Sequence, residues 1–277
     1  MNTVYASLLA VTAMLWLASC APTSETGKIT GVETKEVLFK RGHQLYLEQN
    51  YDSAAVTLQK AIAIDSSYIP PLEDLAAMHY DLGMREQGAK SPKRLGEFRK
   101  SRIYYTRIET LGNKGSDLYE RVCELSVALD DNKSFLKYAK RNAEMYPYDR
   151  QYLNLGVAYY SADDFANVIK TQKEAIERFK LSSFIGGFYR QLGRAYMKVD
   201  RDQTAERTFT IGVQVVNARI GELRKHNSNY KSSDEYRRLL DDKIGMLVSL
   251  KKLHQTYRAL DKLEQVEKEL KEVGYQK

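Results

Sequence analysis

The stretch that decides the fold is residues 189–212, which read YRQLGRAYMKVDRDQTAERTFTIG. Large side chains stand at Tyr189, Leu192 and Tyr196, three or four residues apart, so they share one face of a helix. Small residues accompany them at Gly193 and, further along the chain, at Ala205 and Gly212. Two antiparallel helices approach closely where a small side chain faces a large one. The stretch therefore predicts a tightly packed pair of helices.

The same arrangement recurs along the chain. Aligned on the small residue of the first helix, the copies place Gly42, Ala76, Cys123, Gly156 and Gly193 at equivalent positions. A period near 34 residues is typical of helical repeat proteins. The pattern resembles the tetratricopeptide repeat (TPR), with five loosely matching copies in residues 34–219. The resemblance implies an all-α fold, a right-handed superhelical solenoid of antiparallel helix pairs.

The second copy is longer than the others, because 47 residues separate Ala76 from Cys123. Glycine and proline interrupt helices and mark loops. The extra segment contains Gly83, Gly88, Pro92 and Gly96. We therefore expect helices at 71–82 and 97–111, joined by a basic inserted loop at about 83–96.

Residues 220–277 are expected to form a C-terminal helical pair that caps the solenoid, since terminal repeats are commonly atypical. Apolar residues three or four apart run through Leu250, Leu253, Tyr257, Leu260, Leu263, Val266 and Leu270. Such a stripe indicates packing inside the last pair. The alternative is that the stripe joins copies of the chain into a structural oligomer.

The N-terminus has the character of an export signal. Residues 1–19 carry no charged side chain and are mostly apolar, as in a secretory signal peptide. Leu17-Ala18-Ser19-Cys20 resembles the bacterial lipobox, which implies cleavage before Cys20 and its modification by lipid, including palmitate. Acyl chains anchor a protein to a membrane. The alternative is a plain signal peptide with a chance cysteine.

Residues 20–33 are polar and predict a flexible tether, because such a composition buries too little apolar surface to fold. Ala21 follows the lipobox cysteine, whereas an Asp at that position resembles an inner-membrane retention signal. The resemblance thus implies an outer-membrane lipoprotein of the bacterial cell envelope that faces the periplasm.

The sequence offers little for catalysis. The four histidines are His43, His79, His226 and His254, and none has the spacing of a metal-binding motif. The chain also lacks the glycine-rich phosphate cradles and nucleophile motifs of common enzymes. We expect no catalytic residue, no metal and no cofactor, and a role as an enzyme subunit of the envelope is the weaker alternative.

Basic residues exceed acidic ones by 43 to 36, a net charge of +7. Much of the excess lies near the insertion, at Arg85, Lys90, Lys93, Arg94, Arg99, Lys100 and Arg102. Such a cluster can attract anionic lipid, lipopolysaccharide or an acidic partner, or it can simply solubilise a loop. Nucleic acid is not expected as a partner of an exported protein.

In the TPR family, set positions of each first helix line a concave groove that binds other proteins. Carried over by the alignment, these positions are Phe39, His43, Tyr46, Glu120, Glu124, Leu153, Val157, Tyr160, Arg190, Arg194 and Lys198. The resemblance implies a membrane-anchored scaffold or adaptor whose partners are envelope proteins or peptides. Pilotins of type IV pilus secretins and docking platforms for cell-wall or outer-membrane assembly are organised similarly.

The last three groove residues are spaced four apart, so Arg190, Arg194 and Lys198 form one basic stripe on a helix. Such a stripe could hold a carboxylate by charge-assisted hydrogen bonds. The alternative is that these side chains point into solvent or pair with nearby acids such as Asp200.

Overall fold

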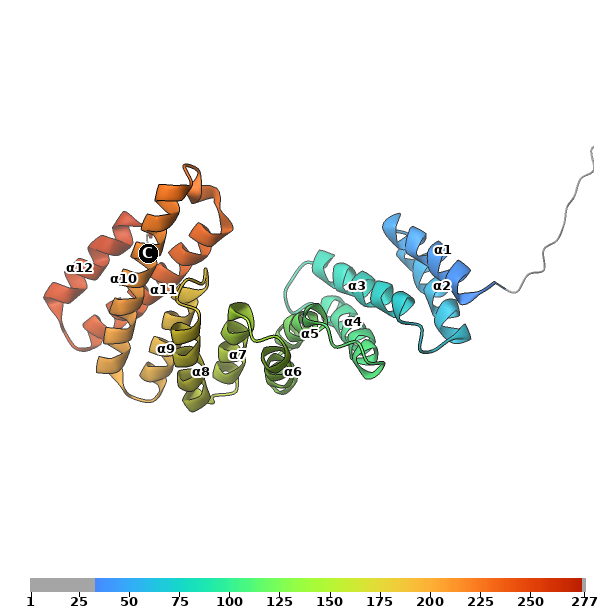
Figure 1. The fold of residues 1–277 in the computed structure, drawn as a ribbon, viewed down its shortest axis with the longest axis horizontal. Helices are drawn as coiled ribbons and strands as arrows, with labels where there is room; N and C mark the ends of the chain where they lie inside the picture. The colour runs from blue at the N-terminus through green and yellow to red at the C-terminus, as the bar shows by residue number, and fades with distance from the viewer. Residues whose placement is uncertain (1–32, 276–277) are drawn as a thin grey trace, which may run out of the picture. The chain divides into compact units, whose positions relative to one another are not determined.

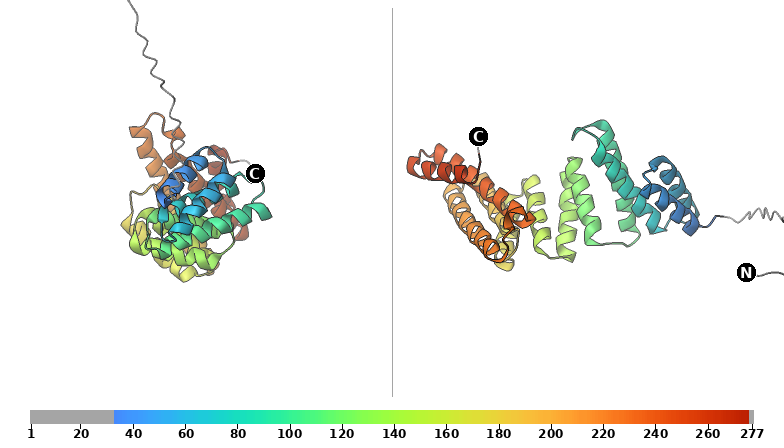
Figure 2. Two further views of the ribbon diagram at one scale, coloured as in Figure 1. Left: turned by 90° about the vertical axis from the view of Figure 1, so that its right-hand side faces the viewer. Right: turned by 90° about the horizontal axis from the view of Figure 1, so that it is seen from above.

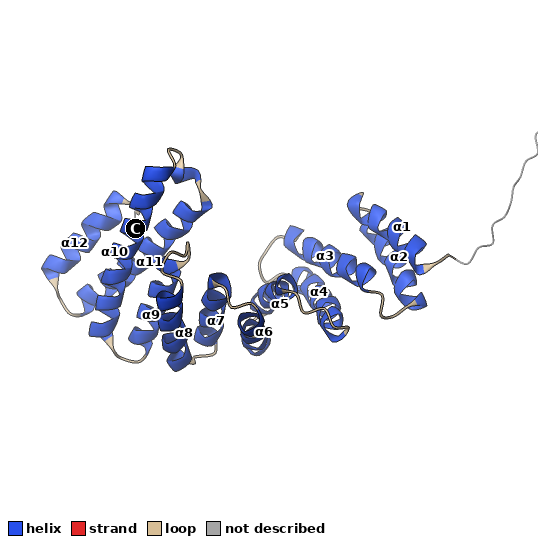
Figure 3. Cartoon of the chain, viewed as in Figure 1, coloured by secondary structure: helices blue, strands red, loops and turns tan. Residues whose placement is uncertain are grey.

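The computed structural model describes residues 33–275, and within that range it consists of α-helices and one short 3-10 helix, with no strand (Figures 1 and 3). The elements are α1 (Lys35–Leu47), α2 (Tyr51–Ile64), α3 (Ile69–Arg85), α4 (Pro92–Thr110), α5 (Ser116–Ala128), α6 (Asn132–Met145), α7 (Asp149–Ser161), α8 (Phe165–Arg178), α9 (Ile185–Lys198), α10 (Asp202–His226), η1 (Tyr230–Ser232), α11 (Asp234–Thr256) and α12 (Leu260–Glu272). Cys20, the predicted signal peptide and nearly all of the predicted tether lie outside the described residues.

Consecutive helices pack as pairs, from α1 with α2 to α11 with α12, and each pair contacts the next (Figures 1 and 2). We call the odd-numbered helices the first helices and the even-numbered helices the second helices. Residues 34–277 form one compact unit, and the hydrophobic clusters of the described residues all lie inside it. This architecture confirms the predicted all-α solenoid of helix pairs.

Small residues of the first helices make these close pairs. A Cβ atom added to Gly42 would lie 2.7 Å from Leu58 Cδ2, and one added to Gly193 would lie 2.6 Å from Phe209 Cδ1. Both distances are shorter than a normal contact between carbon atoms. The facing residue lies sixteen positions after the glycine in each case, so the alignment derived from the sequence matches the packing.

Five of the six turns inside the pairs share one backbone geometry. A residue other than glycine adopts positive φ in five turns of the described chain, between 54° and 61°: these are Gln49, Asp130, Asp163, Asp200 and Arg258. This left-handed region is uncommon for such residues. Because Arg258 joins α11 to α12, the last pair turns in the same way as four of the pairs before it.

The prediction of a loop at 83–96 is wrong, because most of these residues are helical. Helix α3 continues to Arg85 and α4 begins at Pro92, which leaves residues 86–91 as the connection. Gly83 is buried inside α3, where an added Cβ would lie 2.5 Å from Phe98 Cδ1. This glycine allows a close helix contact, and Pro92 occupies the first turn of a helix, where its missing N–H is tolerated. The basic residues therefore lie largely on helices.

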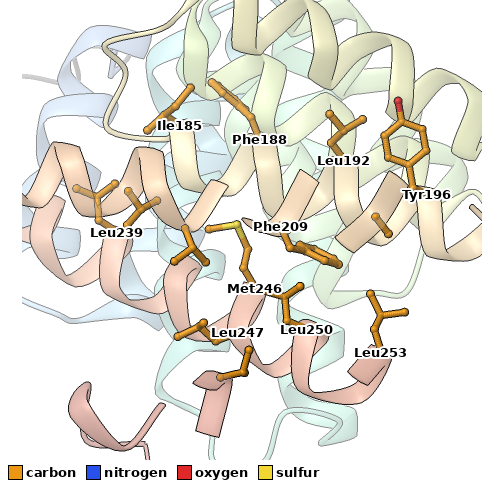
Figure 4. Close-up of a cluster of buried hydrophobic side chains, with 14 of the residues drawn as sticks. Ile185, Phe188, Leu192, Tyr196, Phe209, Leu239, Met246, Leu247, Leu250 and Leu253 are labelled. Carbon is orange, nitrogen blue, oxygen red and sulfur yellow. The ribbon is translucent and has the colours of Figure 1, made fainter. Parts of the chain in front are cut away.

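The largest hydrophobic cluster joins α8, α9, α10, α11 and α12, with Phe209 and Met246 among its buried side chains (Figure 4). Four residues of the C-terminal apolar stripe are buried in it, namely Leu250, Leu253, Val266 and Leu270. Tyr257 and Leu260 stay exposed, at 63% and 72%. Packing inside the last pair thus uses most of the stripe, which leaves little of it for self-association.

In residues 33–275 no helix combines the length and the hydropathy that a membrane crossing requires.

Candidate functional site on the first helices

The first helices of neighbouring repeats are joined by polar side chains. His43 Nδ1 on α1 lies 2.8 Å from Asp74 Oδ2 on α3, and the Tyr46 hydroxyl donates to Asp81 Oδ2 at 2.8 Å. Phe39 is half-buried, with its ring edge-on to Tyr68. All three groove residues predicted on α1 thus lie on one helix, and two of them are bonded to the next repeat.

The next two first helices are acidic. Helices α3 and α5 each carry three acidic side chains and one basic side chain. The predicted groove residue Glu120 accepts from Gln151 Nε2 at 2.9 Å, and Glu124 accepts from the Tyr80 hydroxyl at 3.2 Å and from Arg121 at 2.8 Å. Both carboxylates therefore help to join repeats while remaining at the surface.

A cavity of about 460 Å³ opens between α3, α4 and α5, and its lining includes Glu73, Asp74, Asp117 and Arg121. Burial raises the pKa of Glu73 and of Asp74 above the ordinary value of a carboxyl group. Three carboxylates against one guanidinium make this part of the first-helix surface negative.

The predicted groove residues on helix α7 are apolar or aromatic. Leu153 packs against α9, where a Cβ added to Gly187 would lie 2.8 Å from its Cδ1 atom. Val157 is 39% exposed, and the half-buried Tyr160 ring stands edge-on to Phe165 with centroids 5.3 Å apart. Val157 and Tyr160 are thus open to a partner, whereas Leu153 mainly supports the next repeat.

The basic stripe on α9 is interrupted at Arg190. Its Nε lies 3.2 Å from Asp242 Oδ1 on α11, but the N–H is not directed at that oxygen, so the contact is an ion pair without a hydrogen bond. Asp242 is 8% exposed, and burial raises its pKa to about 6 although Arg190 opposes the rise. The sequence suggested Asp200 as a partner for the stripe, whereas the acid that Arg190 meets is Asp242.

The other two cations of the stripe are available. The Arg194 guanidinium lies over the Tyr160 ring, 4.7 Å from its centroid, which is within the range of a cation–π interaction. Arg194 and Lys198 are exposed, and in residues 33–275 neither has a carboxylate within 4.0 Å. The open basic site therefore comprises Arg194, beside an aromatic ring, and Lys198, one turn further along α9.

Together these side chains make the character of the first-helix surface change along the array. It is acidic at α3 and α5, apolar at α7, and basic at α9, which carries three cations and no acid. The sequence alignment supplied most of these residues but missed Tyr80, Arg121 and Asp242. The first two could have been found by extending the same alignment to α3 and by reading the neighbour of Glu120. Asp242 lies in the last pair, which the alignment did not cover.

Metal binding has no clear site here: the described residues contain no group of three His, Cys, Asp or Glu side chains arranged to hold an ion.

No protein-family model and no curated protein matches the chain. Solved structures similar to it include the MamA protein, at 16% sequence identity and a TM-score of 0.53, covering 68% of this chain and 95% of that one. Another is YrrB, described as a TPR protein with an unusual peptide-binding site, at 13% identity and a TM-score of 0.52, covering 66% of this chain and 87% of that one. At such low identity the likeness establishes the fold, which is that of TPR proteins.

Proposed function

We propose that the chain is a membrane-anchored protein-binding scaffold of the bacterial cell envelope, which holds a peptide or a partner protein against its first helices. The TPR-type fold supports protein binding, since repeat solenoids present extended surfaces to their partners. The YrrB structure, similar in fold, is described as having a peptide-binding site. Lipidation of Cys20 and the envelope location rest on the sequence.

The observation that carries the proposal is the α7–α9 surface. Val157 and Tyr160 offer apolar contact, and Arg194 lies over the Tyr160 ring. Lys198 follows one turn later on α9, and neither cation has a carboxylate within 4.0 Å in the described chain. An apolar side chain followed by a carboxylate would fit this arrangement. Hydrogen bonds from cations to a carboxylate are about twice as strong as those between neutral groups, so these two residues are expected to dominate binding.

Site-specific photocrosslinking in cells that produce the protein tests this assignment. A photoreactive amino acid at Val157 should give adducts with a partner, which mass spectrometry identifies. The matched control is Ile211 on α10, a second-helix residue that is 48% exposed. Combining the Val157 probe with Arg194→Glu and Lys198→Glu should remove the adducts, and circular dichroism should show an unchanged fold.

Arg190 is left intact in this experiment, because a glutamate there would face the buried Asp242. Equal adducts at Val157 and Ile211, or adducts that persist in the folded double variant, would place the partner elsewhere.

Anchoring is tested separately by metabolic labelling with a clickable palmitate analogue. Wild-type protein should be labelled and processed, whereas Cys20→Ser should remain an unlabelled precursor. Equal labelling of the two proteins would refute lipidation at Cys20 without affecting the binding surface.

A further inference from the structure

Four consecutive second helices, α4, α6, α8 and α10, carry a regular row of cations on the side away from the first helices. Each second helix has a residue that packs against the small residue of its first helix: Ser101 donates its Oγ to the Ala76 carbonyl at 2.7 Å, and Phe209 lies against Gly193. Ala139 and Gln172 take this place on α6 and α8. Two residues earlier, each of these four helices has an exposed cation; the row is Arg99, Lys137, Lys170 and Arg207.

The four cations are not neutralised by ion pairs. Within the described part of the chain, no member of the row has a carboxylate within 4.0 Å. Lys137 lies over the Tyr138 ring at 4.9 Å, which leaves its charge in place. Three flanking lysines are likewise without an ion pair among residues 33–275, namely Lys133, Lys140 and Lys173.

Three acids near the row are engaged by other cations, whereas Glu144 and Glu174 have no cation within 4.0 Å in the described chain and line a cavity together with Lys170. Asp131 pairs with Arg102 at 2.8 Å, and Glu109 pairs with Arg141. Glu97 pairs with Lys100 at 2.8 Å. The first two pairs join α4 to α6, the third lies within α4, and none of the three involves a cation of the row.

The two faces of this part of the array therefore differ in sign. Helix α4 has six basic and two acidic side chains, and α6 has four basic and one acidic. The first helices α3 and α5 have the opposite excess. A charged surface that meets this region will attract one face and repel the other.

We propose that the second helices α4, α6, α8 and α10 bind the surface of an anionic lipid bilayer through this row. One cation recurs on each of four consecutive helix pairs, so the charges are spread over a wide face instead of converging on one ligand. An extended anionic surface offers negative charge over a similarly wide area. Ile103 and Met145, exposed by 65% and 46% on α4 and α6, add apolar side chains that enter the headgroup region.

This orientation turns the acidic first helices away from the lipid. The bilayer then occupies the second helices, and the α7–α9 surface stays free for a protein. The inference does not depend on the proposed function, because it involves a different face and different residues.

The test is sedimentation of residues 34–277, the compact unit, with large vesicles. This fragment lacks Cys20, so an acyl chain cannot contribute. Vesicles with about 30% phosphatidylglycerol should bind the fragment and pure phosphatidylcholine vesicles should not, with binding that falls as salt rises. A cation near an anionic bilayer raises partitioning about fivefold. Changing all four residues of the row to glutamine should therefore lower partitioning by on the order of 500-fold.

The matched control changes four exposed cations outside the row to glutamine, namely Lys40, Arg224, Lys231 and Lys252. It alters net charge equally and should retain most of the binding. Three results would overturn the proposal. The first is unchanged vesicle binding by the folded row variant, and the second is an equal loss of binding in the control. The third is binding to duplex DNA that is as strong as binding to vesicles and depends on salt in the same way. The first removes the row as a site, the second reduces the effect to net charge, and the third assigns the row to nucleic acid.

Discussion

Replacing Gly193 with alanine sets two effects of opposite sign against each other. Inside a helix, alanine is more stable than glycine by about 0.5–1 kcal/mol, because glycine loses more backbone freedom on folding. At this position, however, the new Cβ would lie 2.6 Å from Cδ1 and 2.7 Å from Cζ of Phe209. Phe209 is fully buried, so its ring cannot move into solvent.

Overpacking of a core costs about 1–3 kcal/mol, which exceeds the gain in helix stability. We therefore expect Gly193→Ala to lower the free energy of unfolding by about 1–2 kcal/mol. For a protein of this size that corresponds to a fall in the thermal midpoint of about 2–8 °C. Gly193→Leu should lower it further.

Thermal melting followed by circular dichroism measures the effect. Gly221→Ala is the matched control, because Gly221 lies in α10 with no atom within 4 Å of an added Cβ, and it should raise the midpoint. Phe209→Leu removes the ring atoms that crowd Gly193, so a double-mutant cycle should show favourable coupling of about 1 kcal/mol. A midpoint raised equally by Gly193→Ala and Gly221→Ala would refute the packing assignment.

Other predictions concern buried groups. The Asp242 pKa of about 6 in the folded protein exceeds its ordinary value of 3.8, so stability should fall as pH rises from about 4 through 6, by on the order of 3 kcal/mol. Asp242→Asn should flatten this profile, and parallel profiles would contradict the assignment. Burial raises the pKa of the Cys123 thiol to about 12. In a fragment of residues 34–277, where Cys123 is the one cysteine, iodoacetamide at pH 8 should therefore react about a thousandfold faster with the urea-unfolded chain than with the folded one. Equal reaction rates would refute the burial of this thiol. Gly83→Ala, with Phe98 2.5 Å away, should lower the thermal midpoint, whereas Gly96→Ala, with nothing within 4 Å, should raise it. If neither substitution changed the thermal midpoint, the result would argue against the extended α3–α4 pair.

The sequence was sufficient to predict the helix pairs, because each pair needs a small residue against a large one and the chain repeats that requirement. The error at 83–96 shows the limit of this reasoning. Glycine breaks helices in isolation, but Gly83 serves a close contact with Phe98 that depends on the relative position of two helices. Sequence spacing alone does not distinguish these two roles.

The candidate site was predictable in part, for a related reason. Groove positions follow from the repeat alignment, so Arg194 and Lys198 were found together with Arg190. The partner of Arg190 comes from α11, whose register against α9 is set by packing at Gly186, where an added Cβ would lie 2.8 Å from Asp242 Cβ. The cation row on the second helices recurs at a fixed position in the sequence. Its lack of ion pairs, however, depends on which cations the neighbouring carboxylates contact in the folded structure.

The hydrophobic clusters differ in size along the array, and this has a mechanical consequence. Among residues 33–275, the cluster nearest the N-terminus contains four buried residues and the one at the C-terminus contains sixteen. Because each pair is held mainly by its neighbours, local opening should require least free energy at α1 and α2. Tension applied through the N-terminal end would therefore detach this pair first. That step would expose Leu75 and Met78 on α3 while the helices around Phe209 remained folded, so the array would yield in stages from one end.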